Sequence, residues 1–143
     1  NGLEFEISKS ITNKLSAFAN YTYLQGKETT QNRITNKDTI TYNYLLRRPA
    51  HQLNMGISAQ VNTKLRFEIT GRYASKRRDV GGYGAQDVEL KSYVTLAANA
   101  GYQLNKHWRF TADIQNFTNT KYYEVYGFTT MPFNASFGAA FSW

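Results

Sequence analysis

In the segment Phe133-Asn134-Ala135-Ser136-Phe137-Gly138-Ala139-Ala140-Phe141-Ser142-Trp143, every odd position is apolar or aromatic and every even position is small or polar. Successive side chains of a β-strand point to opposite faces, so the alternation predicts a strand with one apolar and one polar face. The indole of Trp143 is amphipathic and suits a boundary between an apolar layer and water. The segment therefore indicates a sheet whose apolar face meets a membrane.

Six further segments repeat this period of two, and none follows the period of a helix. We expect strands at 3–7, 15–23, 53–61, 65–73, 94–104 and 108–114, with Phe18 as the one large residue on the polar side. Short connections at 12–14, 62–64 and 105–107 each contain an asparagine, which tolerates the left-handed conformation of tight hairpins. Long connections cover about 24–50, 75–91 and 118–132 and alternate strictly with the short ones.

The composition supports an all-β membrane protein. The 143 residues include eleven Tyr and nine Phe but two Pro, a balance that favours strands over helices or disorder. The mean hydropathy of −0.56 is typical of a soluble protein, but a membrane barrel gives the same value because its lipid-facing side is averaged with a wet lumen. We therefore predict an antiparallel transmembrane β-barrel, with the charged residues of the polar face lining its lumen: Arg66, Glu68, Arg72, Arg109 and Asp113.

Alternating short and long connections are typical of bacterial outer-membrane barrels, which have tight periplasmic turns and long extracellular loops. On this interpretation the first strand starts at the extracellular side. Such barrels have an even number of strands with both termini in the periplasm, so an odd number of strands must precede it. We expect residues 1–143 to be the closing part of a larger barrel, with the other strands in the same polypeptide or in another chain.

Near its end the chain reads Asp113-Ile114-Gln115-Asn116-Phe117-Thr118-Asn119-Thr120-Lys121-Tyr122-Tyr123-Glu124, followed by Gly127-Phe128 and Pro132, and Arg47-Arg48-Pro49-Ala50-His51 precedes the strand at 53–61. These motifs resemble those of TonB-dependent outer-membrane receptors. The resemblance implies the last seven strands of a 22-stranded barrel in the Gram-negative outer membrane, with a plug domain and TonB box outside this chain. It also implies active transport of a scarce ligand, with TonB as the partner that supplies energy. A ferric siderophore is the favoured ligand, and haem, cobalamin and sometimes sugars or other metals are the alternatives.

Three groups of side chains are candidates for recognition. Phe133, Phe137, Phe141 and Trp143 resemble the C-terminal signal that the barrel-assembly machinery reads, although lipid contact alone also explains them. The basic residues suit either an anionic ligand or the phosphates of lipopolysaccharide, and otherwise form solvated loops: Arg47, Arg48, Lys76, Arg77 and Arg78. Tyr122, Tyr123, Tyr126 and Phe128 are expected either to form an aromatic wall for a ligand or to anchor the chain at the membrane interface.

Other classes of function find little support. The net charge of +7 would suit a nucleic-acid binder, but the sequence shows neither a recognition helix nor the pattern of an aromatic, basic groove. The absence of Cys excludes a thiolate metal site. His51 and His107 are isolated, no motif surrounds any Ser, and His51 and Asp113 lie on different predicted strands. We predict no enzyme activity, catalytic residue, metal or cofactor. The alternatives to a transporter are a passive pore or structural barrel and, less favoured, an outer-membrane hydrolase.

Overall fold

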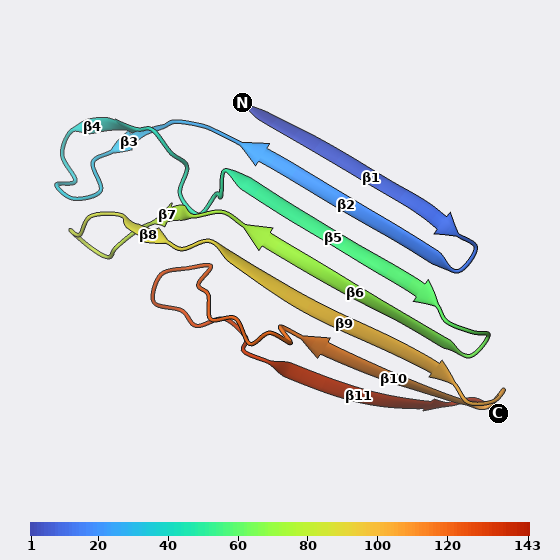
Figure 1. The fold of residues 1–143 in the computed structure, drawn as a ribbon. Coiled ribbons are helices and arrows are strands. Elements are labelled where there is room, and N and C mark those ends of the chain that lie inside the picture. The colour runs from blue at the N-terminus through green and yellow to red at the C-terminus, as the bar shows by residue number, and fades with distance from the viewer.

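The computed structural model describes residues 1–143 and places seven long strands in one antiparallel sheet (Figure 1). They are β1 (Gly2–Thr12), β2 (Leu15–Leu24), β5 (His51–Gln60), β6 (Leu65–Ala74), β9 (Tyr93–Gln103), β10 (Trp108–Gln115) and β11 (Asn134–Phe141). Each strand is hydrogen-bonded to the next in chain order, so the sheet is a simple up-and-down meander. All seven predicted strands are confirmed. β1 continues well beyond its predicted end at residue 7, while β11 leaves Phe133 and Trp143 outside the strand.

The connections differ at the two ends of the sheet (Figure 1). Short turns join the strands at one end, and long loops extend from the other. Two of these loops contain hairpins, formed by β3 (Glu28–Gln31) with β4 (Thr39–Tyr42) and by β7 (Arg77–Asp79) with β8 (Val88–Leu90). The sequence predicted no strands here, because three- and four-residue polar strands carry no readable alternation.

The register places the apolar residues together on one face of the sheet. Ile69 lies opposite both Ile57 and Ala98, and Ala112 lies opposite Phe137. Directly paired residues of antiparallel strands share a face, so the predicted separation into an apolar and a polar face is confirmed. The polar face carries the five charged residues predicted for the lumen: Arg66, Glu68, Arg72, Arg109 and Asp113.

Phe18 lies on the polar face, as predicted, and the residue opposite it explains how the ring is accommodated. That residue is Gly56, where an added Cβ would lie 2.5 Å from Phe18 Cε1 and 3.1 Å from Thr70 Cγ2. The ring therefore occupies the space that a side chain at position 56 would need. One glycine allows a large apolar residue to sit among polar neighbours.

The short turns form differently from our prediction. No turn asparagine adopts a positive φ; the non-glycine residues that do are Asn36, Arg47, Asn116 and Asn119. Instead, the side-chain oxygen of Asn62 accepts hydrogen bonds from the backbone N–H groups of Lys64 and Leu65 at 2.8 and 2.9 Å. Asn105 does the same in the last short turn. The prediction of left-handed asparagines was wrong, because side-chain capping stabilises these turns.

Burial is concentrated where the long loops meet the sheet. Large apolar side chains of the sheet itself are exposed in this chain, for example Phe137 at 82% and Ile57 at 50%. Buried residues at the loop end include Ala74, Ser75, Arg77, Asp79, Leu90, Tyr93 and Asn116. None of the chain's segments is a helix of the length and apolarity that crossing a membrane requires.

Candidate functional site

A buried carboxylate joins three of the long loops. Asp79, at the end of β7, is completely buried. One of its oxygens accepts hydrogen bonds from Arg47 Nε at 2.7 Å and from the Val80 N–H at 2.8 Å. The other accepts the N–H of Tyr126 at 2.7 Å. Burial alone would raise the pKa of Asp79, but hydrogen bonds from Tyr126, Arg47 and Val80 outweigh it and hold the pKa below its ordinary value.

A second carboxylate, Asp87, joins the β3–β4 hairpin to the segment before β8. Arg33 Nη1 lies 2.5 Å from Asp87 Oδ2, and the Tyr44 hydroxyl donates to the same oxygen at 2.7 Å. Burial, and then the hydrogen bond to Asp87, raise the pKa of Tyr44. Arg33 also pairs with Glu28 and lies over the ring of Tyr42, with 3.9 Å between guanidinium carbon and ring centroid. Sequence reasoning missed this junction because no local motif connects residues 54 positions apart.

The last loop, residues 116–133, is held against the polar face of the sheet. The rings of Tyr122 and Tyr93 pack with their centroids 4.2 Å apart. Glu124 accepts a hydrogen bond from the Tyr93 hydroxyl at 2.8 Å and pairs with Arg72 at 3.0 Å. Because Tyr93 and Arg72 belong to the polar face, the loop folds over that face and not over the apolar one.

The two asparagines of the segment Asn116-Phe117-Thr118-Asn119 close the base of this loop. Buried Asn116 donates its side-chain amide to the carbonyls of Thr120 and Met131, at 3.0 and 3.2 Å, and accepts the Thr120 N–H. Asn119 accepts the N–H of Phe133, which leads into β11. Both asparagines have φ near +50°, a conformation that asparagine adopts more readily than most residues. The motif therefore has a structural role.

The structure divides the five predicted basic residues into two groups. Arg47 binds Asp79, and buried Arg77 donates to the carbonyl of Tyr123 and lies over the Tyr93 ring, so both hold the loops together. The other three contribute to a hollow at the loop end, which Arg77 also lines: Arg48, Lys76 and Arg78. The Nη1 atom of Arg77 is buried and has no hydrogen-bond partner.

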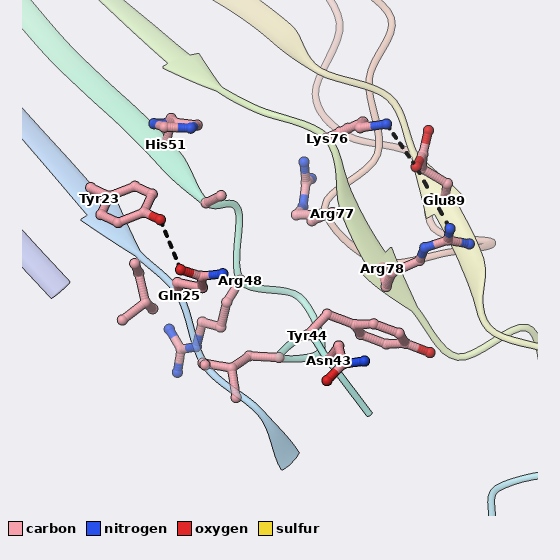
Figure 2. Close-up of a pocket in the computed structure, with 14 residues that line it drawn as sticks. Tyr23, Gln25, Asn43, Tyr44, Arg48, His51, Lys76, Arg77, Arg78 and Glu89 are labelled. Atoms are coloured by element: carbon pink, nitrogen blue, oxygen red, sulfur yellow. Dashed lines mark hydrogen bonds and ion pairs between the residues drawn. The ribbon is translucent and has the colours of Figure 1, made fainter. Parts of the chain in front are cut away.

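We call this hollow the cationic hollow; its volume is about 340 Å³ and Figure 2 shows its lining. Lys76 and Arg78 approach the carboxylate of Glu89 at 3.3 and 3.9 Å. Tyr23 and His51, which are paired across β2 and β5, form another part of the lining.

The two histidines make contacts within the chain. His51 Nδ1 lies 2.8 Å from the hydroxyl of Tyr21, and its ring packs against Tyr23. His107 Nδ1 lies 2.8 Å from the carbonyl of Ser142, and its ring stacks on Phe141. Each ring therefore helps to join neighbouring strands.

A second hollow, of about 600 Å³, brings together three of the four residues predicted as an aromatic wall, and we call it the tyrosine hollow. The fourth, Phe128, is 71% exposed and does not line it. Tyr122, Tyr123 and Tyr126 line it from the last loop, while Lys91 lines it from the segment between β8 and β9. Lys121 adds a second cation, which sequence reasoning missed although it directly precedes the tyrosines.

The aromatic residues at the C-terminal end lie on or beside β11, which pairs with β10 along one of its edges. Phe141 faces Trp108 with ring centroids 5.0 Å apart, and Trp143 is 99% exposed. Together with Phe137, these rings line the apolar side of the edge strand. Recognition of Phe133, Phe137, Phe141 and Trp143 by an assembly machine stays a prediction.

Residues 1–117 match the family model for the TonB dependent receptor-like β-barrel. The chain belongs to the TonB-dependent receptor family. The predicted family and the predicted all-β outer-membrane barrel fold are confirmed. This family consists of outer-membrane transporters and not of enzymes, so the hydrolase alternative is set aside. No curated protein matches the chain.

Solved structures of siderophore receptors share the fold. The siderophore receptor PiuA from Acinetobacter baumannii is 21% identical, with a TM-score of 0.74, over 96% of this chain. The closed form of the ferric-catecholate import receptor Fiu from E. coli K12 is 17% identical, with a TM-score of 0.75, over 99%. The ferripyoverdine receptor of Pseudomonas aeruginosa is 18% identical, with a TM-score of 0.73, over 98%. The chain spans about a fifth of the length of each of these receptors, at 21%, 20% and 19%.

Proposed function

We propose that residues 1–143 form the C-terminal part of the barrel of a receptor that binds a ferric siderophore outside the cell and imports it with energy from TonB. The remaining strands and the plug domain belong to the same receptor. The tyrosine hollow carries this proposal, because it combines aromatic rings with cations at the end of the sheet where outer-membrane barrels have their extracellular loops. Siderophore receptors among the structural neighbours support the ligand class.

The chemistry of the tyrosine hollow suits a bulky chelate with acidic oxygen donors. Lys91 and Lys121 supply positive charge, and the rings of Tyr122, Tyr123 and Tyr126 supply rigid surfaces with polar tips. Contacts of Tyr122 and Glu124 with Tyr93 of β9 hold the last loop and its tyrosines in position, which reduces the entropy lost when a ligand binds. The hollow therefore supports binding of an anionic, ring-containing ligand.

The polar face is proposed to line the lumen around the plug. In a membrane barrel the apolar side of each strand faces lipid and the polar side faces the interior. Arg66, Glu68, Arg72, Arg109 and Asp113 then provide donors and acceptors for water and for the plug. A plug domain elsewhere in the receptor would distinguish an active transporter from a passive pore, because a pore needs no plug.

The aromatic residues beside the open edge of β11 are proposed to guide assembly. Phe137 and Phe141 project from the apolar face, and Phe133 and Trp143 flank the strand. An edge strand presents unpaired backbone groups to which another strand can pair. The barrel-assembly machinery is the proposed partner for this edge, before the first strand of the receptor closes the barrel.

The experiment compares Lys91→Gln/Lys121→Gln with Lys14→Gln in the full-length receptor. Lys14 lies in the first short turn, far along the sheet from the tyrosine hollow. We expect the double variant to lose about tenfold in affinity for ferric siderophores, measured by quenching of intrinsic fluorescence, with the control unchanged. Unchanged affinity in the double variant would refute the assignment of the site.

A gene deletion tests the ligand class separately. Cells without the receptor should lose uptake of radiolabelled iron from a siderophore and keep growth on haem and on cobalamin. If the cells instead lose only growth on haem, or only growth on cobalamin, that compound and not a siderophore is the imported ligand. Uptake that persists when TonB is removed would favour a passive pore.

A further inference from the structure

We propose that the cationic hollow binds the phosphate groups of an outer-leaflet lipid, lipopolysaccharide in an outer membrane, and that its acyl chains lie along the apolar face beneath. The proposal rests on membership of the barrel family and is independent of the imported ligand. It concerns a lasting contact with the membrane and not transport.

The position of the hollow is the first argument. Tyr23 and His51 are paired, and they continue the apolar face beyond the adjacent pair Tyr21 and Leu53. Their side chains therefore lie on the side of the sheet that faces lipid, at the end where the long loops begin. Polar tips mark this level as the interface, since the Tyr21 hydroxyl contacts His51 and the Tyr23 hydroxyl donates to Gln25 at 3.0 Å. Phosphorylated headgroups occupy the same level of the membrane.

The charge of the hollow is the second argument. Its lining holds four cationic side chains, but buried Arg77 is engaged with the Tyr123 carbonyl and the Tyr93 ring. The other three (Arg48, Lys76 and Arg78) with the one carboxylate (Glu89) leave a net charge of +2 for a ligand. Arg48 takes part in none of the chain's ion pairs. Arginine forks bind phosphate oxygens in a bidentate manner, and the single carboxylate neutralises only part of the cluster. The hollow is therefore suited to a polyanion.

The surface below the hollow is the third argument. A groove of about 660 Å³ runs over the apolar side of β2, β5, β6 and β9. Small residues leave space there, among them Ala17, Ala19 and Gly71, and the larger Ile57 and Phe67 line it as well. Tyr73 lines this groove and belongs to the row Tyr21, Leu53 and Tyr73. The next pair along β2 and β5, Tyr23 and His51, lines the cationic hollow. A charged hollow directly above an apolar groove is complementary to a phosphorylated lipid.

The fourth observation separates this site from the tyrosine hollow. The last loop, with Tyr122 and Glu124, folds over the polar face, whereas Tyr23 and His51 belong to the apolar face. The two hollows share only Glu89 in their linings. Changes at Arg48, Lys76 and Arg78 should therefore leave recognition of the imported ligand unaffected.

The test uses the full-length receptor with Arg48→Gln/Lys76→Gln/Arg78→Gln, and Arg66→Gln/Arg109→Gln as the control. The control pair lies on the polar face of the same sheet. We expect the triple variant to retain at least fivefold less lipopolysaccharide after extraction in mild detergent, measured by mass spectrometry of the intact complex. Siderophore binding should stay unchanged in both variants. Equal retention of lipopolysaccharide in the triple variant and the wild type would overturn the proposal.

Two further arms distinguish the source of the phosphate and the role of the groove. Vesicles containing lipopolysaccharide should bind the wild type better than vesicles with the dephosphorylated lipid, and millimolar inorganic phosphate should not displace the lipid. Displacement by inorganic phosphate would show a site for soluble anions and refute the proposal. Ala19→Leu, which fills the groove, should also reduce retention, whereas Ala139→Leu on β11 of the same face should not. Equal retention in Ala19→Leu and Ala139→Leu would refute the acyl-chain part of the proposal.

Discussion

The sheet and the loop end of this receptor segment are stabilised in different ways. In the sheet, backbone hydrogen bonds join each strand to the next, large apolar side chains stay exposed, and the ion pair Arg66–Glu68 spans a long 3.8 Å. At the loop end, buried polar side chains such as Asp79 and Asn116 connect segments far apart in the chain. The sheet thus depends on regular backbone pairing and on surrounding lipid, while the loop end depends on a few specific side chains.

The largest effect is expected at the Asp79 junction. Asp79→Ala removes the acceptor of the Arg47 side chain and of two backbone N–H groups, which we expect to cost about 3 kcal/mol in docking of the loops. Hydrogen exchange of the full-length receptor should show faster exchange at the loops and unchanged exchange in the sheet. Asp113→Ala is the matched control with little expected effect, because this half-buried carboxylate on the polar face accepts hydrogen bonds only from the side chains of Asn99 and Gln115. Equal protection of the loops in both variants would contradict the comparison.

Acid should loosen the same junction and spare the sheet. The pKa of Asp79 is lowered from its ordinary 3.8, so its contribution to stability is complete above that value and is lost as the pH falls through the lower, folded-state pKa. Proteolysis of the loops should therefore stay constant from neutral pH to about pH 5 and rise only below the ordinary pKa of the carboxyl. Asp79→Asn should abolish this acid dependence. A rise that begins near neutrality would show that another group controls docking.

Within the sheet, a smaller effect is expected at Gly56. Gly56→Ala places a methyl group against the ring of Phe18, and overpacking of this kind costs about 1.5 kcal/mol. The temperature at which the folded barrel loses its characteristic mobility in gel electrophoresis should fall. Gly101→Ala, whose Cβ would come no closer than 3.7 Å to Arg109 Nη2, should not lower it. Combining Gly56→Ala with Phe18→Ala should relieve the clash.

The smallest effect is expected in the short turns. Asn62→Ala removes the acceptor of two backbone N–H groups at an exposed turn, which should cost about 0.5 kcal/mol. Asn13→Ala should be neutral, because the equivalent hydrogen bond in the first turn goes to the hydroxyl of Thr12. The same gel assay, repeated across a series of denaturant concentrations, measures both variants. A larger loss from Asn13→Ala than from Asn62→Ala would contradict the capping role.

The sequence predicted the sheet well and the loops poorly. Alternation placed every long strand and sorted Ile57, Ile69 and Phe137 onto one face, because a period of two is a local property of the chain. The same reasoning assigned one backbone conformation to all turn asparagines and was wrong. It found Tyr122, Tyr123 and Tyr126 as a group but missed Lys91, which reaches the tyrosine hollow from another loop.

The basic residues show the same limit. Arg47 and Arg48 are neighbours in sequence and read alike, yet one binds buried Asp79 and the other lines the cationic hollow. Arg77 and Arg78 are also neighbours with different partners, because successive residues of β7 point to opposite sides. Arg77 donates to the Tyr123 carbonyl, whereas Arg78 lies near Glu89. Which cation is available to a partner depends on contacts with Asp79, Glu89 and Tyr123, and these come from distant segments.

The amino-acid sequence by itself determined the strands, their two faces and the alternation of short and long connections. These features follow from local periodicity and from turn chemistry, which involve residues a few positions apart. Only the tertiary structure decided which loops join through Asp79 and Asp87, which face the last loop covers, and which cations line the cationic hollow. Those outcomes depend on contacts between side chains of separate hairpins. A sequence pattern describes residues a few positions apart and does not predict such long-range contacts.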